Sequence, residues 1–173
     1  MAAKSKSFTA KEFVEEAKKN RRADDYSVYF PSKNKKDLKA NGDAKVFFIN
    51  ITGVVYDFVK QVAEESGLKN GFVLCSTKHT TSSVFVNHFE QGLLADILKK
   101  LDDFYPHKKY DHDNWDLQQN GVAHLKAMQM GRGAVLPIEN GRIVLGEYEN
   151  VIYGEFADRD EEAKEYIIAV YGE

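Results

Sequence analysis

Histidines are the most informative residues for function in this chain, because imidazole can bind a metal ion or transfer a proton near neutral pH. The chain has five histidines, and His79, His112 and His124 each stand within a polar motif. Three imidazoles around a metal with one open position form a catalytic type of site for zinc or a similar ion. We therefore consider a site built from these three histidines, although each is also compatible with a structural role.

His79 begins a run of hydroxyl residues, Thr80-Thr81-Ser82-Ser83. Hydroxyls and backbone N–H groups at a junction between two strands suit a phosphate or another oxyanion. The same residue types also favour strands and turns, so the run alone leaves a structural role open.

The other two histidines have polar neighbours at chemically useful positions. Asp113 adjoins His112, and such a carboxylate can fix the tautomer of an imidazole or raise its basicity. The same residues are also compatible with a solvated acidic loop that has no function. Asn120 lies one predicted helical turn before His124, on the same helix face. The alternative for His124 is a partly buried histidine bonded to the backbone.

Standard catalytic and metal motifs are absent from the sequence: it contains no His-Glu-x-x-His, no paired Cys-x-x-Cys and no Gly-x-Ser-x-Gly. The glycines Gly131 and Gly133 indicate a turn. Cys75 is the single cysteine and lies in an apolar predicted strand, which is typical of a buried structural thiol. One cysteine allows no intramolecular disulfide, in keeping with a reducing compartment.

The net charge of −3 argues against a dedicated nucleic-acid or membrane-surface binder, which usually carries a basic excess. The local basic runs near residues 18–22 and 33–39 are typical of solvated faces. No stretch approaches the roughly 20 apolar residues of a membrane span, and the N-terminus has no apolar signal region. We expect a cytoplasmic protein.

The elements that must position these residues follow a change in composition near residue 42. Residues 1–42 are polar and form a predicted N-terminal appendage with one helix at about 9–22, for which Ser7 and Thr9 are candidate caps. Residues 43–173 form the main predicted domain. Apolar spacing predicts its helices at 54–66, 90–104 and 121–130. Runs of β-branched and aromatic residues predict strands at 44–51, 71–76, 82–87, 134–138, 142–146, 151–156 and 166–171.

Three punctuating features complete this pattern. Thr52 is a candidate helix cap and Gly67 a helix stop, and Asn140-Gly141 between two apolar runs predicts a hairpin. The polar segment 105–120 is long for a passive connection. Helices and hairpins alternate without a βαβ rhythm, so we predict an α+β fold with a mixed or antiparallel sheet packed against helices.

From Ile51 to the end, the chain resembles the YjbQ family, also called secondary thiamine-phosphate synthases. The resemblance rests on an ordered set of motifs rather than on any single one. These are Ile51-Thr52, Ser66-Gly67, Asn70-Gly71, His79-Thr80-Thr81, Val86-Asn87, Asp96, Pro106, Tyr110-Asp111-His112-Asp113, Ala123-His124-Leu125-Lys126, Pro137, Gly141-Arg142, Leu145-Gly146, Glu155 and Gly172-Glu173.

The resemblance implies a YjbQ-like α+β fold, a homotrimer, and a site near subunit contacts that contains the three histidines and takes a metal or an anion. It also implies weak thiamine-phosphate synthase activity. We assign His79, His112, His124 and Asp113 to catalysis, with the three histidines also as metal ligands. We assign a phosphorylated or anionic substrate to Thr80, Thr81, Ser82, Asn87, Asn120 and Lys126.

Two parts of the chain depart from the family pattern in ways that bear on chemistry. His88 stands where the family usually has glutamate, and residues 146–149 read Gly-Glu-Tyr-Glu in place of Gly-Thr-Trp-Gln. Three functions stay open. They are a thiamine-phosphate synthase, a metal-dependent hydrolase or lyase of a small phosphorylated substrate, and a non-catalytic trimer that binds a ligand. The metal differs between them, since diphosphate chemistry normally uses Mg²⁺ whereas histidines favour Zn²⁺.

Overall fold

A computed structural model describes residues 2–9, 28–29, 46–116, 118–157 and 165–173. They form two sheets in which every pair of neighbouring strands is antiparallel. Sheet A has the order β1 (Ala2–Thr9), β9 (Glu165–Gly172), β4 (Gly71–Thr77), β6 (Gly133–Glu139) and β7 (Arg142–Ile143). Sheet B has the order β2 (Val28–Tyr29), β3 (Phe47–Asn50), β8 (Asn150–Glu155) and β5 (Ser82–Asn87). The predicted α+β class is confirmed.

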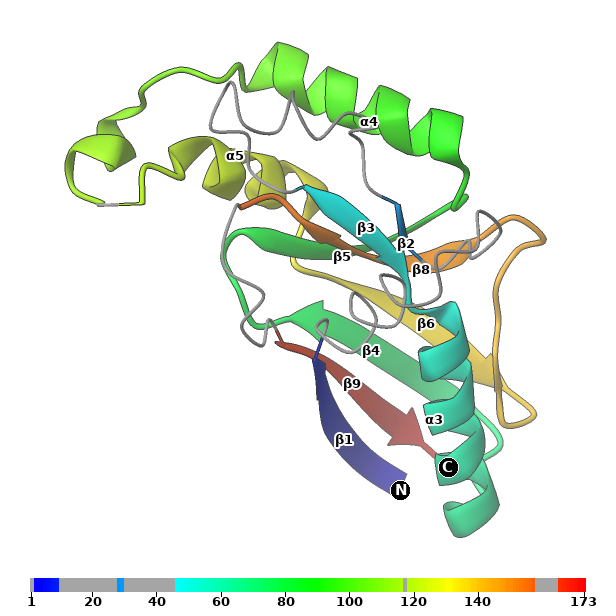
Figure 1. Cartoon of the computed structure of the whole chain (residues 1–173). Coiled ribbons are helices and arrows are strands. Elements are labelled where there is room, and N and C mark those ends of the chain that lie inside the picture. Colours follow the sequence, from blue (N-terminus) through cyan, green and yellow to red (C-terminus); the bar gives the residue numbers. More distant parts are fainter. Residues whose placement is uncertain (1, 10–27, 30–45, 117, 158–164) are drawn as a thin grey trace.

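The helices cover two different parts of this frame (Figure 1). Helices α4 (Gln91–Phe104) and α5 (Gly121–Met130) lie over sheet B, and α3 (Thr52–Ser66) runs along the side of the two sheets. A short 3₁₀ helix, η1 (Asp111–Asn114), interrupts the long polar segment that joins α4 to α5. Among the described residues, no helix has both the length and the apolar character needed to cross a membrane.

Two apolar cores result from the alternation of side chains along each strand of sheet B. On β3, Ile49 faces the core shared with α3 and sheet A, whereas its neighbour Phe48 faces the core under α4 and α5. On β8, Tyr153 and Ile152 divide in the same way. Sheet B is therefore covered on both faces, and the second core holds α5 in place.

Most predicted elements are found within a few residues of their expected bounds. The helix at 121–130 and the strand at 82–87 agree with α5 and β5, and Gly67 ends α3 in a left-handed conformation with φ of 72°. The expected cap Thr52 is instead the first residue of α3. Its N–H donates to Oδ1 of Asn50 at 3.1 Å, because the asparagine side chain reaches the first free amide of the helix.

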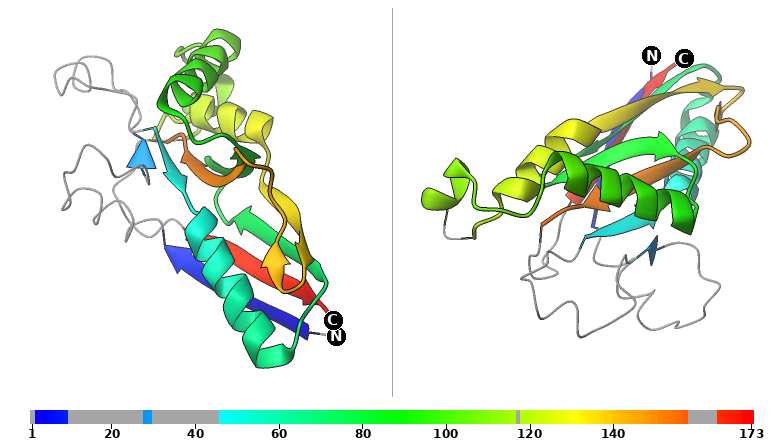
Figure 2. Two further views of the ribbon diagram at one scale, coloured as in Figure 1. Left: turned by 90° about the vertical axis from the view of Figure 1, so that its right-hand side faces the viewer. Right: turned by 90° about the horizontal axis from the view of Figure 1, so that it is seen from above.

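The N-terminal segment joins the main sheet. β1 pairs along its whole length with β9, from Ala2 opposite Gly172 to Thr9 opposite Glu165, so the two ends of the chain lie side by side (Figure 2). The candidate caps Ser7 and Thr9 are residues of this strand. The predicted helix at 9–22 lies almost entirely outside the described residues, and the domain boundary at residue 42 stays a prediction.

Candidate functional site

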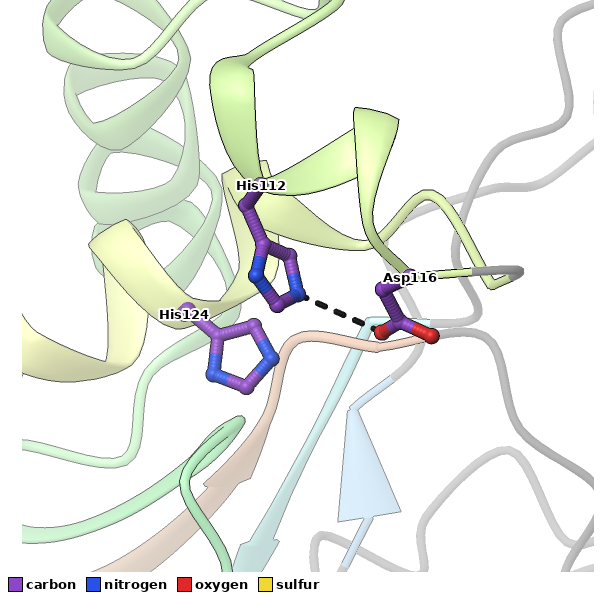
Figure 3. Close-up of side chains that lie close together, drawn as sticks. All are labelled: His112, Asp116 and His124. Carbon is purple, nitrogen blue, oxygen red and sulfur yellow. Dashed lines mark hydrogen bonds and ion pairs between the residues drawn. The ribbon is translucent and has the colours of Figure 1, made fainter.

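Two of the three histidines meet beside η1. His112 belongs to η1 and His124 to α5, and their rings pack edge to face with centroids 4.7 Å apart and planes 69° apart. Figure 3 shows both rings on the same side of the junction between these elements. The polar segment between α4 and α5 therefore places His112 against His124 of α5.

Asp116 completes this group and was not foreseen from the sequence. Its Oδ2 lies 3.2 Å from Nε2 of His112 (Figure 3). Its Oδ1 accepts a hydrogen bond from the N–H of Gln118 at 3.1 Å, which orients the carboxylate. The sequence signal was present: Asp116 follows His112 by four residues, the spacing of neighbours on a helical turn.

The three side chains form a candidate site for a transition-metal ion. Ligand atoms of His112, Asp116 and His124 all lie within 4.8 Å of one another, the one such group of three found among the described residues. Tetrahedral ligands with bonds of roughly 2 Å stand roughly 3.3 Å apart, close to the 3.2 Å between His112 and Asp116. Two imidazoles with a carboxylate suit zinc or iron better than Mg²⁺.

Two side-chain oxygen atoms lie close to Nε2 of His112. Besides Asp116, Oδ1 of Asn120 lies 3.1 Å from Nε2. Two oxygen acceptors around one ring nitrogen favour either the tautomer with its hydrogen on Nε2, which donates to them, or a cation between the groups. Asn120, predicted to bind substrate or an anion, therefore belongs to the immediate surroundings of the histidine pair.

Asp113 fastens η1 to the start of α5. Its two carboxylate oxygens accept hydrogen bonds from the N–H of Tyr110 and the N–H of Gly121, each at 2.8 Å. These bonds hold the pKa of Asp113 below its usual range. A Cβ at position 121 would lie 3.0 Å from Asp113 Oδ1, a tight contact, so this close approach favours glycine.

Lys126 points away from solvent and pairs with α4. Its side chain is 2% exposed, and Nζ donates to Oδ1 of Asp102 at 2.5 Å, with Nε2 of His107 at 3.3 Å. The lysine expected to contact an anion thus ties α5 to the end of α4. Asn87, which was also predicted to bind the substrate, is the last residue of β5. Its Oδ1 accepts a hydrogen bond from the N–H of His88 at 2.9 Å.

His79 lies at the turn from β4 to β5 and does not join the group around His112 within one chain. Its N–H donates to Oγ1 of Thr77 at 3.0 Å. The hydroxyls of Thr81 and Ser82 are buried; Thr81 donates to Glu155 Oε1 at 3.0 Å, and Ser82 contacts the Thr77 hydroxyl. Thr80 is exposed on this turn.

Glu155 is the centre of the buried network below His79. This carboxylate is fully buried and also accepts the hydroxyl of Tyr153 at 3.1 Å and the N–H of Phe156 and Ala157. Burial, and next the charge of Glu155, raise the pKa of Tyr153. The hydroxyl run therefore anchors the turn from beneath, while His79 and Thr80 form its surface.

Two departures from the family pattern contact each other. The rings of His88 and Tyr148 lie 5.3 Å apart between centroids, and both side chains are exposed. His88 occupies the expected glutamate position and Tyr148 the expected tryptophan position, so the two changes affect one local surface.

Fold and site together define an α+β protein of two antiparallel sheets with a histidine–aspartate cluster beside a 3₁₀ helix. The family profile described as "UPF0047 protein YjbQ-like" matches residues 36–173, and the chain belongs to this family.

Relatives and solved structures agree with the assignment. A UPF0047 protein of Archaeoglobus fulgidus is 38% identical over 103 residues, 59% of this chain and 80% of the relative. Another, from Methanothermobacter thermautotrophicus, is 32% identical over 120 residues, 69% of this chain and 80% of the relative. A YbjQ-like protein of unknown function from Sulfolobus solfataricus has a similar fold, with a TM-score of 0.68 at 23% identity, covering 99% of this chain and 100% of that one.

Proposed function

We propose that this protein is a metal-dependent enzyme that hydrolyses a small phosphorylated or anionic substrate, with a zinc-like ion held by His112, Asp116 and His124. The convergence of these three ligand atoms within 4.8 Å is the observation that carries the proposal. When bound, such an ion supplies Lewis-acid chemistry and activates water for nucleophilic attack. This set keeps two of the three predicted histidine ligands and replaces His79 with Asp116.

The residues around the cluster have supporting roles. Asp113 positions His112 and His124, because it bonds both η1 and the first residue of α5. Its lowered pKa makes it a weak base, so positioning suits it better than proton transfer. Lys109 is exposed and lies three residues before His112, so it is available to an anionic substrate, whereas Lys126 is buried.

The thiamine-phosphate synthase activity implied by the family resemblance is the second candidate. That reaction transfers an aminopyrimidinylmethyl group from its diphosphate to the nitrogen of a thiazole phosphate and releases pyrophosphate. The cluster favours hydrolysis over this transfer, since two imidazoles suit zinc better than the Mg²⁺ of diphosphate chemistry. The non-catalytic alternative predicts metal or ligand binding without turnover.

Metal content tests the ligand set. We expect the full chain, purified without added chelator and reloaded with Zn²⁺, to bind about one equivalent per chain by mass spectrometry of the metal and by calorimetry. His112→Ala, His124→Ala and Asp116→Asn should each weaken binding at least about tenfold. His107→Ala is the matched control, because its ring lies beside Asp102 and Lys126. Equal binding by wild type and His124→Ala would overturn the proposal.

His79→Ala separates the two ligand sets. Retention of Zn²⁺ by this variant supports the histidine–aspartate set, and loss of Zn²⁺ supports the three-histidine set drawn from the sequence. Activity is then measured on the zinc-loaded chain with p-nitrophenyl phosphate and, separately, with both thiamine-phosphate precursors. Turnover that Asp116→Asn abolishes identifies the reaction; zinc binding with no turnover in either assay supports the non-catalytic alternative.

A further inference from the structure

A groove separate from the histidine cluster lies at the C-terminal end of α3. It opens between α3 and the hairpin turn that joins β6 to β7, and its volume is about 510 Å³. In Figure 1 this end of α3 lies at the opposite end of the molecule from η1. We call it the basic groove, lined by Tyr56, Lys60, Glu64, Lys69, Asn140 and Arg142.

The turn between β6 and β7 forms part of the groove. Asn140 and Gly141 both have positive φ, 51° and 74°, as the predicted hairpin requires. The N–H of Gly141 donates to the carbonyl of Lys69 at 2.9 Å. A Cβ at Gly141 would lie 3.1 Å from Cβ of Ala63, so the turn packs closely on α3 and fixes the position of the next residue, Arg142.

Positive charge comes to the groove from three separate elements. Lys60 lies on α3, Lys69 follows α3, and Arg142 begins β7. Glu64 is the one carboxylate in the lining, and it lies 3.9 Å from Lys60. Within the described part of the chain, neither Lys69 nor Arg142 forms an ion pair. The lining therefore carries three cationic side chains against one carboxylate, with Glu139 opposite Arg142 on the neighbouring strand, in a chain whose net charge is −3.

We propose that the basic groove binds the phosphate group of a small molecule, at a site distinct from the histidine cluster. The guanidinium of Arg142 suits phosphate because its planar donors can bind two oxygens at once, while Lys69 adds a point charge. The negative end of the α3 dipole opposes an anion here, but charge-assisted hydrogen bonds are the stronger effect. Tyr56, 36% exposed, offers a flat surface for the remainder of the ligand.

Inorganic pyrophosphate is the probe, titrated calorimetrically into the full chain in EDTA so that no metal contributes. The test variant is the double substitution Lys69→Gln with Arg142→Gln. The matched control is Lys99→Gln with Lys100→Gln, which removes the same charge from the exposed face of α4. A His124→Ala protein reports whether pyrophosphate instead binds at the histidine cluster. Amide resonances of Gly67 and Gly141 locate the binding in the wild type.

We expect the groove variant to lose at least about tenfold in affinity, with the control and His124→Ala within about twofold of wild type. The amide resonances of Gly67 and Gly141 should shift on titration. The proposal is overturned if wild type does not bind, if the control loses as much as the groove variant, or if His124→Ala abolishes binding. Because the titration contains no metal, these outcomes leave the proposed metal site untouched.

Discussion

The rings of His112 and His124 pack edge to face, 4.7 Å apart between centroids, at a junction that the carboxylate of Asp113 fastens. Neither the 3₁₀ helix nor α5 alone would bring the two imidazoles together. Asp113 therefore acts as a clamp between η1 and α5, and its charge should control the integrity of the site.

The Asp113 clamp predicts a specific dependence of stability on pH. Two backbone N–H groups lower the pKa of Asp113 in the folded chain, so its contribution is present above the usual aspartate pKa of about 3.9 and is lost as pH falls toward the lower folded value. We expect Asp113→Asn to be less stable than wild type at pH 7, with the difference narrowing below about pH 4. Urea unfolding of metal-free protein between pH 7 and pH 3 measures this.

Asp103→Asn is the control for this experiment, because its carboxylate is exposed and pairs only with Lys100 in the described structure. It should follow the wild-type curve closely. A stability difference between wild type and Asp113→Asn that stays constant across the whole pH range would contradict the clamp.

In the ion pair between Lys126 and Asp102, we expect removal of one partner to cost more stability than removal of the other. Its ammonium is buried whereas Asp102 is about half exposed, so removing the carboxylate leaves a buried charge unpaired. We expect Asp102→Asn to lower the free energy of unfolding by about 1–3 kcal/mol, and Lys126→Met, which fills the same space without charge, by less than about 1 kcal/mol. Urea unfolding at pH 7 measures both.

The exposed pair Lys100–Asp103 is the control for this comparison, and Lys100→Met should change the free energy of unfolding by less than about 0.5 kcal/mol. A larger loss for Lys126→Met than for Asp102→Asn would show that the ammonium has another essential partner, and the structural role given to Lys126 would then be wrong.

Cys75 was predicted to be a structural thiol, and its surroundings support that interpretation. It is fully buried in β4, and burial raises the pKa of its thiol to about 12. Since the thiolate is the reactive form, we expect no reaction with a disulfide reagent such as dithionitrobenzoate at pH 8 in the folded chain, and one thiol per chain in urea. Rapid reaction without denaturant would contradict this placement.

Local patterns in the sequence were enough for most elements of the frame. The apolar face of α3 and the Asn140-Gly141 turn were both predicted, because each depends on residues adjacent in the chain. β1 was missed because its lysines and serines show no apolar alternation, and the strand exists through pairing with β9 at the far end of the chain. Pairing between distant segments has no local signal.

The same distinction between local and distant signals applies to the site residues. His112, Asn120 and His124 were foreseen and do converge, whereas Asp116 was overlooked despite its helical spacing from His112. Lys126 was predicted to bind the ligand because its charge can be read from the sequence. Its burial beside Asp102 depends on tertiary structure and cannot be read there. The distance from His79 to this group likewise depends on tertiary structure.

The outer face of sheet A is a candidate contact surface for the homotrimer that the family resemblance implies. Phe72 and Tyr171 stack with centroids 5.2 Å apart and are 45% and 38% exposed, and Val135 on β6 is 61% exposed. The register places Phe72 opposite Tyr171, and Leu74, two residues along the same face, opposite Val135. Apolar side chains on one face of a sheet favour burial against a second copy.

We therefore expect wild-type protein to be a trimer by light scattering and Val135→Lys to dissociate into monomers, because each contact would bury an unpaired charge. Met128→Lys is the control, since this exposed apolar residue lies on α5, above the opposite sheet. Circular dichroism confirms that both variants are folded. A trimer that survives Val135→Lys but is lost in Met128→Lys would place the subunit contact on the helical layer, beside the histidine cluster, and not on sheet A.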